Sequence, residues 1–155
     1  MTLPTSMVID SFRGNFYFLS NMYPLSSPIY HQNIGYNTSE HLFVALKSLD
    51  PNVRLHIARQ KDGFAAKRAG KKIVLRHGYA GIRVQLMRYT VRRKYCDAML
   101  AQMLIRTEPA TLIEGNKHHD NFWGTCMCEN CKYKPGMNVL GQILTEVRTE
   151  LILIG

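Results

Sequence analysis

The sequence has no long apolar run, and this absence narrows the class of protein. Of its 155 residues 46% are hydrophobic, yet no stretch approaches the ~20 apolar residues that a membrane-spanning helix needs. The opening MTLPTSMVIDSF lacks a basic segment followed by an apolar one, so no secretory signal is readable. Repeats, low-complexity blocks and linker-like segments are also missing. We therefore expect a single domain over residues 1–155, located in the cytoplasm.

Acidic side chains are scarce, because 11 Asp and Glu stand against 20 Lys and Arg, for a net charge of +9. The basic residues form short clusters at residues 59–61, 67–68, 71–72 and 92–94. Such a charge favours an anionic partner, either a phosphorylated small molecule or a nucleic acid. A basic surface that serves solubility alone is the alternative.

Cysteine is also rare, but three of the four cysteines fall within six residues, at Cys126, Cys128 and Cys131. In a cytosolic chain this spacing favours metal binding or redox chemistry over a disulfide framework. Three sulfurs and one further ligand would make a tetrahedral structural zinc site. A loop of reduced thiols is the alternative. The fourth ligand could be His118, His119 or Cys96, and we choose His118.

The single tryptophan stands in the most distinctive segment, residues 118–124, which reads HHDNFWG. Trp123 offers an aromatic face, Asp120 a carboxylate, and Gly124 a backbone that a ligand can approach closely. These are the parts of a site for a flat, polar ligand. The alternative is a loop whose tryptophan fills the core.

The residue pattern predicts an α+β fold that is mostly helical, with a small N-terminal β-sheet. Strand-like runs lie at residues 16–19, 28–30 and 111–114. A first helix is expected after a cap at Thr38 or Ser39, and Pro51 should end it. A short helix is expected after Asn52 and another from Asp62 to Gly70. Apolar stripes predict a long helix over residues 82–106 and a last helix from Asn138 onward. Their members are Ile82, Leu86, Tyr89, Tyr95, Met99, Met103 and Leu104 in the first, and Leu140, Leu144, Val147 and Leu151 in the second.

Short motifs follow one another in a fixed order along nearly the whole chain. The most specific are Tyr36-x-x-Ser39-Glu40-His41 and Asp120-x-x-Trp123-Gly124. The others are Phe12-x-Gly14 with Phe18-Leu19-Ser20-Asn21, Ala45-x-Lys47, Ala66-Lys67-x-x-Gly70, Arg76 with Tyr79, Lys94-Tyr95, Leu112-Ile113-Glu114 and Gly136-x-Asn138-x-Leu140-Gly141. In these motifs the chain resembles the NADAR family of N-glycosidases, the YbiA-like proteins.

The resemblance implies a YbiA-like fold and hydrolysis of an N-glycosidic bond, with no cofactor required for catalysis. Members of the family act on ribosylamino-pyrimidine phosphates of riboflavin synthesis, or on ADP-ribosyl groups, including ADP-ribose attached to guanine. The implied partner is therefore a phosphorylated ribosyl or ADP-ribosyl small molecule. ADP-ribosylated nucleic acid is a further candidate, and no membrane partner is expected.

Cleavage of a glycosidic bond passes through an oxocarbenium-like state, which a nearby carboxylate stabilises. Glu40 is our first candidate for this role and Asp120 the second. Lys47 lies two helical turns after Glu40, so we expect it on the same helix face, where it meets a phosphate or steadies the Glu40 charge. An ordinary first-turn glutamate is the alternative for Glu40. The predicted substrate contacts are Gly14, Asn21, Lys47, Lys67, Arg76, Tyr79, Trp123 and Gly124. Among these, Arg76 and Lys67 are the candidate phosphate contacts, with a solvated surface position as the alternative.

Two positions depart from the family pattern. Gly78-Tyr79 stands where many members carry an Asp-Trp pair, so the aromatic ring is kept and the carboxylate is lost. Val44 replaces a residue that is often glutamine, which removes one hydrogen bond to the ligand. A function of a different class also fits the charge and the cysteines, namely a zinc-stabilised nucleic-acid-binding module without catalysis.

Overall fold

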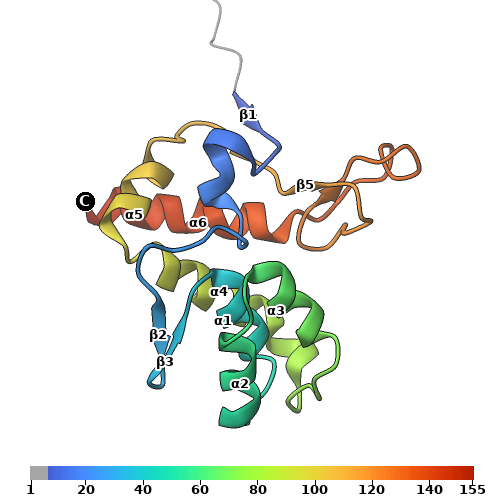
Figure 1. The fold of residues 1–155 in the computed structure, drawn as a ribbon. Coiled ribbons are helices and arrows are strands. Elements are labelled where there is room, and N and C mark those ends of the chain that lie inside the picture. The colour runs from blue at the N-terminus through green and yellow to red at the C-terminus, as the bar shows by residue number, and fades with distance from the viewer. Residues whose placement is uncertain (1–6) are drawn as a thin grey trace, which may run out of the picture. The chain divides into compact units, whose positions relative to one another are not determined.

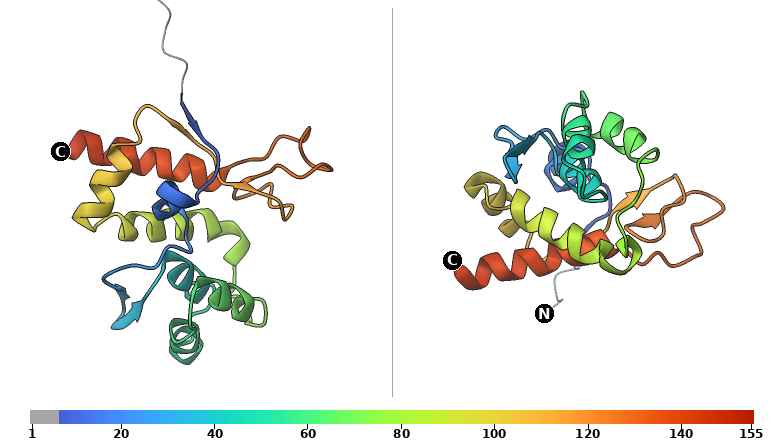
Figure 2. Two further views of the ribbon diagram at one scale, coloured as in Figure 1. Left: turned by 45° about the horizontal axis from the view of Figure 1, so that its top comes forward. Right: turned by 90° about the horizontal axis from the view of Figure 1, so that it is seen from below.

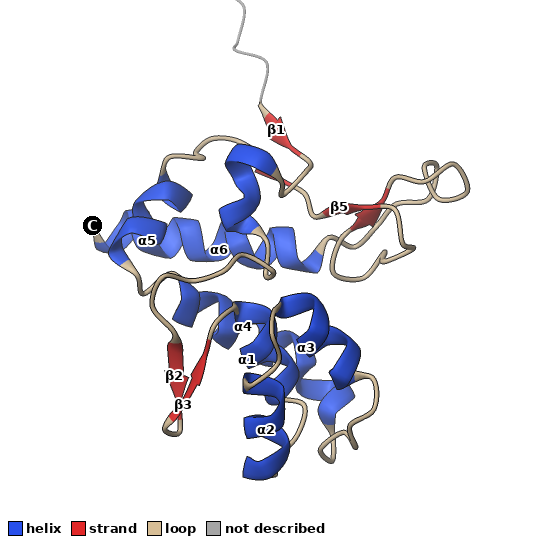
Figure 3. Cartoon of the chain, viewed as in Figure 1, coloured by secondary structure: helices blue, strands red, loops and turns tan. Residues whose placement is uncertain are grey.

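The computed structural model describes residues 7–155 and is mostly helical, as Figures 1 and 3 show. The predicted α+β class is confirmed, with seven helices and six short strands among these residues. In chain order they are β1 (Val8–Ile9), the 3₁₀ helix η1 (Gly14–Leu19), β2 (Ile29–His31), β3 (Ile34–Tyr36), α1 (Ser39–Ala45), α2 (Pro51–Ala58), α3 (Gly63–Gly70), α4 (Tyr79–Lys94), α5 (Ala98–Ile105), β4 (Thr111–Leu112), β5 (Gly115–Asn116), β6 (Thr125–Cys126) and α6 (Val139–Ile154).

Contacts divide the chain into two compact units. The central unit is residues 21–94 and holds β2 through α4. The terminal unit combines residues 7–20 with residues 95–155. The expectation that no secretory signal is readable rests partly on residues 1–6, which lie outside the part of the chain that the structure describes. No described helix is both long enough and apolar enough to cross a membrane.

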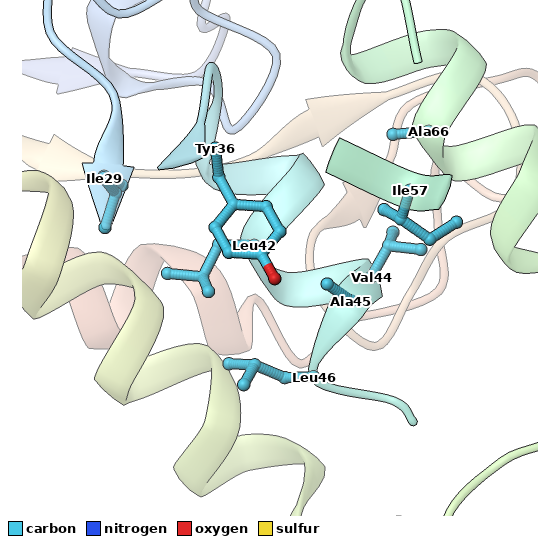
Figure 4. Close-up of a cluster of buried hydrophobic side chains, with 8 residues drawn as sticks. All are labelled: Ile29, Tyr36, Leu42, Val44, Ala45, Leu46, Ile57 and Ala66. Carbon is cyan, nitrogen blue, oxygen red and sulfur yellow. The ribbon is translucent and has the colours of Figure 1, made fainter. Parts of the chain in front are cut away.

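Helix α1 forms the middle of the central unit, because every residue from Ser39 to Ala45 is buried. It packs against α2, α3 and α4 and against the hairpin of β2 and β3. A helix that is covered on all sides places its polar residues inside as well. Figure 4 shows the apolar cluster around it, made of Ile29, Tyr36, Leu42, Val44, Ala45, Leu46, Ile57 and Ala66.

Side-chain caps set the starts of four helices. Thr38, Asp50, Asp62 and Asp97 each accept a hydrogen bond from a backbone N–H of the first turn, which satisfies a donor that has no partner within the helix. The predicted caps at Thr38 and Asp62 are confirmed. Pro51 does not end the first helix, which stops earlier at Ala45. Instead it opens α2, where the N–H that proline lacks is not needed.

The predicted strand at residues 16–19 is wrong, because these residues belong to η1. Gly14 opens this helix with a φ of +56°, a left-handed conformation that favours glycine. Phe18 and Leu19 are both buried, whereas neighbours in a strand point to opposite faces. The Tyr95 hydroxyl donates a hydrogen bond to the Phe18 carbonyl at 3.1 Å. Burial of two adjacent apolar residues therefore comes from a short helix here.

The single helix predicted over residues 82–106 is also wrong, because it is two helices, α4 and α5. Asp97 caps α5 by accepting a hydrogen bond from the Leu100 N–H at 2.9 Å. Such a cap offers the backbone an alternative to continuing the helix. The apolar stripe runs through both helices, so periodicity alone hides the break at residues 95–97.

Helix α6 organises the terminal unit. Of the predicted apolar face, Leu140, Leu144 and Val147 are buried and Leu151 is half-buried. Helix α5 and strand β4 pack against it, and β4 pairs in parallel with β1, as β5 does with β6. The buried Arg148 of α6 pairs with Glu108 at 2.9 Å, which ties the segment before β4 to the helix. Figure 2 shows a long loop that links β6 to the start of α6.

Candidate functional site

Glu40 lies in the first turn of α1, in a position that Asn21 fixes. The Glu40 N–H donates to the Asn21 carbonyl at 3.0 Å, and the Ser39 hydroxyl donates to the Asn21 side-chain oxygen at 3.0 Å. The Asn21 amide nitrogen lies 3.4 Å from the sulfur of Met87. Asn21 is itself buried. The residue predicted to contact the ligand therefore holds the N-terminus of α1 in place.

His41, beside Glu40, is fully buried and has both ring nitrogens engaged. Its Nε2 lies 2.9 Å from the Gln60 carbonyl, and its Nδ1 lies 2.7 Å from the Thr38 hydroxyl. A carbonyl oxygen can only accept, so Nε2 carries the proton and Nδ1 accepts from Thr38. His41 thus secures α1 to the segment before α3 and is not placed for proton transfer to a substrate.

Lys47 and Glu40 interact electrostatically, although they do not share a helix face. Lys47 lies beyond the end of α1, so that part of the expectation is wrong. Burial lowers the pKa of Lys47 below 10.5, the Glu40 carboxylate partly offsets this, and the Lys67 ammonium adds to it. The Lys47 Nζ lies 5.4 Å from the centroid of the Phe43 ring and 5.8 Å from that of Tyr79, within reach of cation–π attraction.

Tyr79, the first residue of α4, completes this group of the central unit. Burial raises the pKa of its phenol, the Arg83 guanidinium lowers it, and the Glu40 carboxylate raises it again. The phenol therefore keeps its proton at neutral pH and can donate a hydrogen bond. Together Glu40, Lys47 and Tyr79 provide a buried carboxylate, an ammonium and an aromatic ring.

The two predicted phosphate contacts, Arg76 and Lys67, differ in their surroundings. The Arg76 N–H donates to the Lys47 carbonyl at 2.7 Å, and its guanidinium donates to the Leu46 carbonyl at 3.3 Å. Because these carbonyls follow the end of α1, Arg76 caps that helix, as a cation can. Lys67 is exposed on α3 and close enough for its charge to lower the pKa of Lys47. It therefore adds to the positive potential near Lys47.

Asp120, in the terminal unit, closes a tight turn that carries Trp123. Its Oδ1 accepts hydrogen bonds from the N–H groups of Phe122 at 3.1 Å and Trp123 at 2.9 Å. The two aromatic rings meet edge to face with centroids 4.7 Å apart. The carbonyls of Phe122, Trp123 and Gly124 accept from the N–H groups at the start of α6. The turn is thus seated on the N-terminus of this helix.

The two glycines predicted to contact the ligand both have structural explanations. A Cβ at Gly124 would collide with the Glu114 carbonyl, so packing within the terminal unit requires this glycine. A Cβ at Gly14 would meet nothing within 4 Å, but its left-handed φ favours glycine. A ligand contact at either position stays a prediction.

Four side chains converge beside β6 and form what we call the Cys/His cluster: His119, Cys126, Cys128 and Cys131. Their ligand atoms all lie within 4.8 Å of one another. The His119 Nδ1 is 3.3 Å from the Cys131 sulfur, 3.6 Å from that of Cys128 and 3.9 Å from that of Cys126. All three cysteines are free thiols. The cluster could therefore bind a metal ion.

His118 is not part of this cluster, so its choice as the fourth ligand is wrong and His119 takes that place. The Asn116 side-chain oxygen accepts hydrogen bonds from the N–H groups of His118 at 3.2 Å and Asp120 at 3.1 Å. Between them His119 adopts a left-handed φ of +67°. This backbone turn brings the ring of His119, and not that of His118, to the thiols.

Hydrogen bonds within the cluster favour ionisation of Cys126. Burial of this thiol opposes ionisation, but hydrogen bonds from Cys128, His119 and Cys131 outweigh it and lower the pKa of Cys126 to about 7. Burial raises the pKa of Cys131, and its neighbours in the cluster raise it further. The thiols therefore differ in their readiness to become thiolates, which are the form that binds metal.

An open groove of about 580 Å³ lies along α6 and β4 and is lined by Leu112, Gly141 and Thr145, among others. None of the predicted site residues lines it in the described part of the chain. It also lacks the cations that a phosphate needs. The candidate site is therefore the group around Glu40 and not this groove.

The sequence model of the NADAR domain matches residues 11–152. This chain belongs to the NADAR family. The N-glycosidase YbiA of Escherichia coli (strain K12) is 33% identical over 147 residues, which cover 90% of this chain and 88% of that protein. The N-glycosidase Npun_R5314 of Nostoc punctiforme is 31% identical over 129 residues, 79% of each chain. Both relatives are named N-glycosidases.

A third relative is longer than this chain. A riboflavin biosynthesis protein of Vibrio vulnificus is 34% identical over 137 residues, which cover 86% of this chain. The chain spans only 35% of that protein. The NMR structure of E. coli YbiA matches the NADAR fold described here with a TM-score of 0.78 and 31% identity, over 97% of this chain and 88% of that one. The predicted YbiA-like fold is therefore confirmed.

Sequence reasoning alone misses two members of the group around Glu40. Phe43 supplies a ring beside Lys47, and Arg83 acts on the pKa of Tyr79. Arg83 stands four residues after Tyr79 within α4, and residues at that spacing are neighbours on a helix. Lys47 lies beyond the end of α1, so the same rule does not cover Phe43. The spacing is therefore a usable signal for Arg83 only.

Proposed function

We propose that this protein hydrolyses the N-glycosidic bond of a ribosyl-phosphate or ADP-ribosyl substrate. The observation that carries the proposal is a buried carboxylate, Glu40, within electrostatic range of Lys47 and Tyr79 in a chain of the NADAR family. Relatives named as N-glycosidases and as a riboflavin biosynthesis protein support this class of substrate.

In the proposed reaction, water adds to C1 of the ribose while the C1–N bond breaks. The bonding electrons leave with the nitrogen, which takes up a proton, and the sugar is released with a hydroxyl on C1. Positive charge develops on the ring oxygen and C1 in the transition state. Glu40 stabilises this charge or takes the proton from the attacking water. Because its position is fixed by Asn21, little reorganisation is needed.

The proposed phosphate contacts are Lys47 and Lys67. Lys67 adds to the lowering of the Lys47 pKa, which means that the two ammonium groups repel each other. A phosphate between them would relieve this repulsion. The central unit as a whole favours anions, because residues 21–94 hold 14 of the 20 basic residues and three of the 11 acidic ones.

Asp120 and Trp123 are proposed to bind the sugar and the leaving base. A tryptophan face can stack on a base, a contact worth about 1–3 kcal/mol in nucleic-acid complexes. Asp120 is the second candidate catalytic carboxylate, with ribose hydroxyls as its partners. Its hydrogen bonds to Phe122 and Trp123 also give it a structural role, so loss of its charge alone should weaken activity less than loss of the Glu40 charge.

No metal is proposed in the reaction, because the carboxylate and ammonium groups supply the chemistry it needs. The metal that we propose for this protein, a zinc ion in the Cys/His cluster, is structural. The competing function, a zinc-stabilised nucleic-acid-binding module, fits the positive charge of the central unit and the Cys/His cluster. A binding module has no use for a buried carboxylate inside that positive unit, whereas a glycosidase does.

The proposal is tested by incubating the purified protein with ADP-ribosylated DNA, NAD and a ribosylamino-pyrimidine phosphate. Mass spectrometry then measures the release of base or amine together with the free sugar. We expect turnover of at least one compound, with Glu40→Gln inactive and the exposed Glu146→Gln as a matched control. Tight, salt-sensitive binding of unmodified DNA without turnover of any compound would favour the binding module instead.

A further inference from the structure

We propose that the Cys/His cluster holds one zinc ion that clamps the loop carrying Asp120 and Trp123. The site consists of His119, Cys126, Cys128 and Cys131. The inference concerns folding of the terminal unit and does not depend on the proposed hydrolysis.

The distances within the cluster fit a tetrahedral zinc ion. Zn–S bonds of about 2.3 Å and Zn–N bonds of about 2.0–2.1 Å place a nitrogen and a sulfur ligand about 3.6 Å apart in a regular tetrahedron. The three distances from the His119 Nδ1 to the sulfurs are 3.3, 3.6 and 3.9 Å. They scatter evenly about that value, so an ion can enter with small adjustments of the side chains.

The ligand set points to zinc and to a structural role. Three thiols and one imidazole form a soft, four-coordinate set that suits zinc. Cys126 and Cys131 are buried, Cys128 is half-buried and His119 is exposed, so the ion is shielded from water on the side of the thiols. Four protein ligands leave no position for a substrate or a reactive water, so the ion would have no direct part in catalysis.

Backbone hydrogen bonds hold the ligands in place around the site. The Cys126 N–H donates to the Asn121 side-chain oxygen at 2.8 Å. The Cys128 carbonyl accepts from the N–H groups of Cys131 at 3.0 Å and Lys132 at 2.8 Å. The last two bonds form the turn that brings the second and third cysteines together. Contacts of this kind orient the ligands of a metal and preorganise the site.

The loop around the cluster has little else to stabilise it. Between β5 and α6, residues 117–138 contain only the two-residue strand β6, and Figures 1 and 2 show the loop extending from the start of α6. Several of its large side chains are exposed, with Tyr133 at 88% and Met137 at 58%. Loops of this length without a core of their own are uncommon in compact domains, and a metal is one way to order them.

The placement of the ligands explains what the metal would order. His119 immediately precedes Asp120, and Cys126 follows Gly124 by two residues. An ion bound to both closes the intervening segment into a ring. It therefore fixes the turn in which Asp120 bonds the N–H groups of Phe122 and Trp123. Without the metal this turn keeps its hydrogen bonds to Asp120 and to the start of α6, but the ring between His119 and Cys126 is no longer closed.

The first test measures the metal content of protein purified without a chelator. We expect close to one zinc per chain in the wild type and in two matched controls, Cys96→Ser and His118→Ala. Cys126→Ser with Cys131→Ser should lose the zinc, and His119→Ala should release it to a chelator at much lower chelator concentration. The assignment would be overturned if the folded wild type held no zinc and showed four titratable thiols. A disulfide within the cluster, or stoichiometric iron in place of zinc, would also overturn it.

The second test works on the wild-type protein and does not require any variant to fold. The chain contains one tryptophan, Trp123, so its fluorescence reports on the clamped segment. Chelation should shift the emission of Trp123, and one equivalent of zinc should restore it. Cobalt in place of zinc should give the intense visible bands of a tetrahedral thiolate site. Unchanged emission after complete removal of zinc would overturn the clamp, and octahedral cobalt spectra would overturn the ligand set.

Discussion

At the scale of single residues, the central unit keeps a carboxylate buried next to a cation that burial disfavours. Glu40 is only 8% exposed, and its charge partly restores the pKa of Lys47 that burial lowers. Groups whose pKa is shifted by burial and by a specific charged partner are concentrated at functional sites. Here the charge of each residue offsets part of the cost of burying the other. Both charges can also interact with a ligand that is itself charged.

The first prediction is that Glu40→Gln abolishes hydrolysis while the protein stays folded. An amide has the shape of the carboxylate but cannot stabilise positive charge at C1. Loss of one such electrostatic group in an enzyme lowers kcat on the order of 10²-fold or more. Steady-state kinetics give the activity, and thermal unfolding gives the stability. Near-wild-type turnover by folded Glu40→Gln protein would rule out this role for the residue.

The second prediction concerns pH. We propose that the ammonium form of Lys47 binds the phosphate of the substrate, and burial lowers its pKa below 10.5. As pH rises through this lowered pKa the charge is lost, so kcat/KM should fall on the alkaline side at a lower pH than for an ordinary lysine. Lys47→Arg should move the fall to higher pH, because a guanidinium keeps its proton. A pH profile of kcat/KM that is identical in the two proteins would contradict a phosphate contact at this position.

The same lowered pKa has a consequence for stability. The unfolded chain binds the Lys47 proton more tightly than the folded protein does, so the charged lysine disfavours folding at neutral pH. Its contribution therefore becomes more favourable as pH rises from the folded-state pKa toward 10.5.

At the scale of elements, the group around Glu40 and the turn that carries Trp123 both depend on the ends of helices. Asn21 and Thr38 hold the first turn of α1, while the carbonyls of residues 122–124 receive the first N–H groups of α6. Donors and acceptors at helix ends have no partner inside the helix, so side chains and neighbouring segments supply one. A segment that does so is oriented by the end of that helix.

The third prediction tests this seating of the Trp123 turn. Gly124→Ala should destabilise the protein by about 1–3 kcal/mol, the usual effect of inserting an atom into a packed site, because the new Cβ meets the Glu114 carbonyl. Gly81→Ala is the control. A Cβ at Gly81 in α4 meets nothing within 4 Å, and alanine in a helix is favoured over glycine by roughly 0.5–1 kcal/mol. Urea unfolding measures both, and equal midpoints for the two variants would refute the packing explanation.

At the scale of the whole molecule, positive charge is concentrated in one unit. Residues 21–94 carry a net charge of +11, and the remaining residues carry −2. The clusters that look scattered along the sequence therefore belong almost entirely to the central unit. A field of one sign over a compact unit attracts polyanions and raises their association rate.

The fourth prediction follows for a nucleic-acid substrate. If the central unit meets the phosphate backbone, KM for ADP-ribosylated DNA should rise with salt more steeply than KM for a small ADP-ribosyl compound. Lys71→Glu with Lys72→Glu should raise KM for the DNA substrate, and Arg13→Glu with Arg106→Glu in the terminal unit is the control of equal charge. Kinetics over a range of NaCl concentrations make the comparison. Equal salt responses for the two substrates would restrict the substrate to small molecules.

The sequence by itself determined the class of fold, the family and the candidate residues, because those depend on local and ordered signals. Capping residues such as Thr38 and Asp62, the stripe of α6, and the series of motifs can all be read without coordinates. The same signals fail where competing local structures share one pattern. The adjacent apolar residues of η1 imitate a strand, and the stripe across α4 and α5 hides the cap at Asp97.

Only the tertiary structure decided which side chains act together. The choice of His119 over His118 depends on a left-handed backbone and on hydrogen bonds to Asn116, which no spacing rule contains. The approach of Lys47 to Phe43 and Tyr79 depends on where the chain turns after α1. Capping and periodicity act over a few residues and are written in the sequence. The meeting of Lys47 with Tyr79 and of His119 with Cys131 depends instead on the path of the chain between residues that are well separated in sequence.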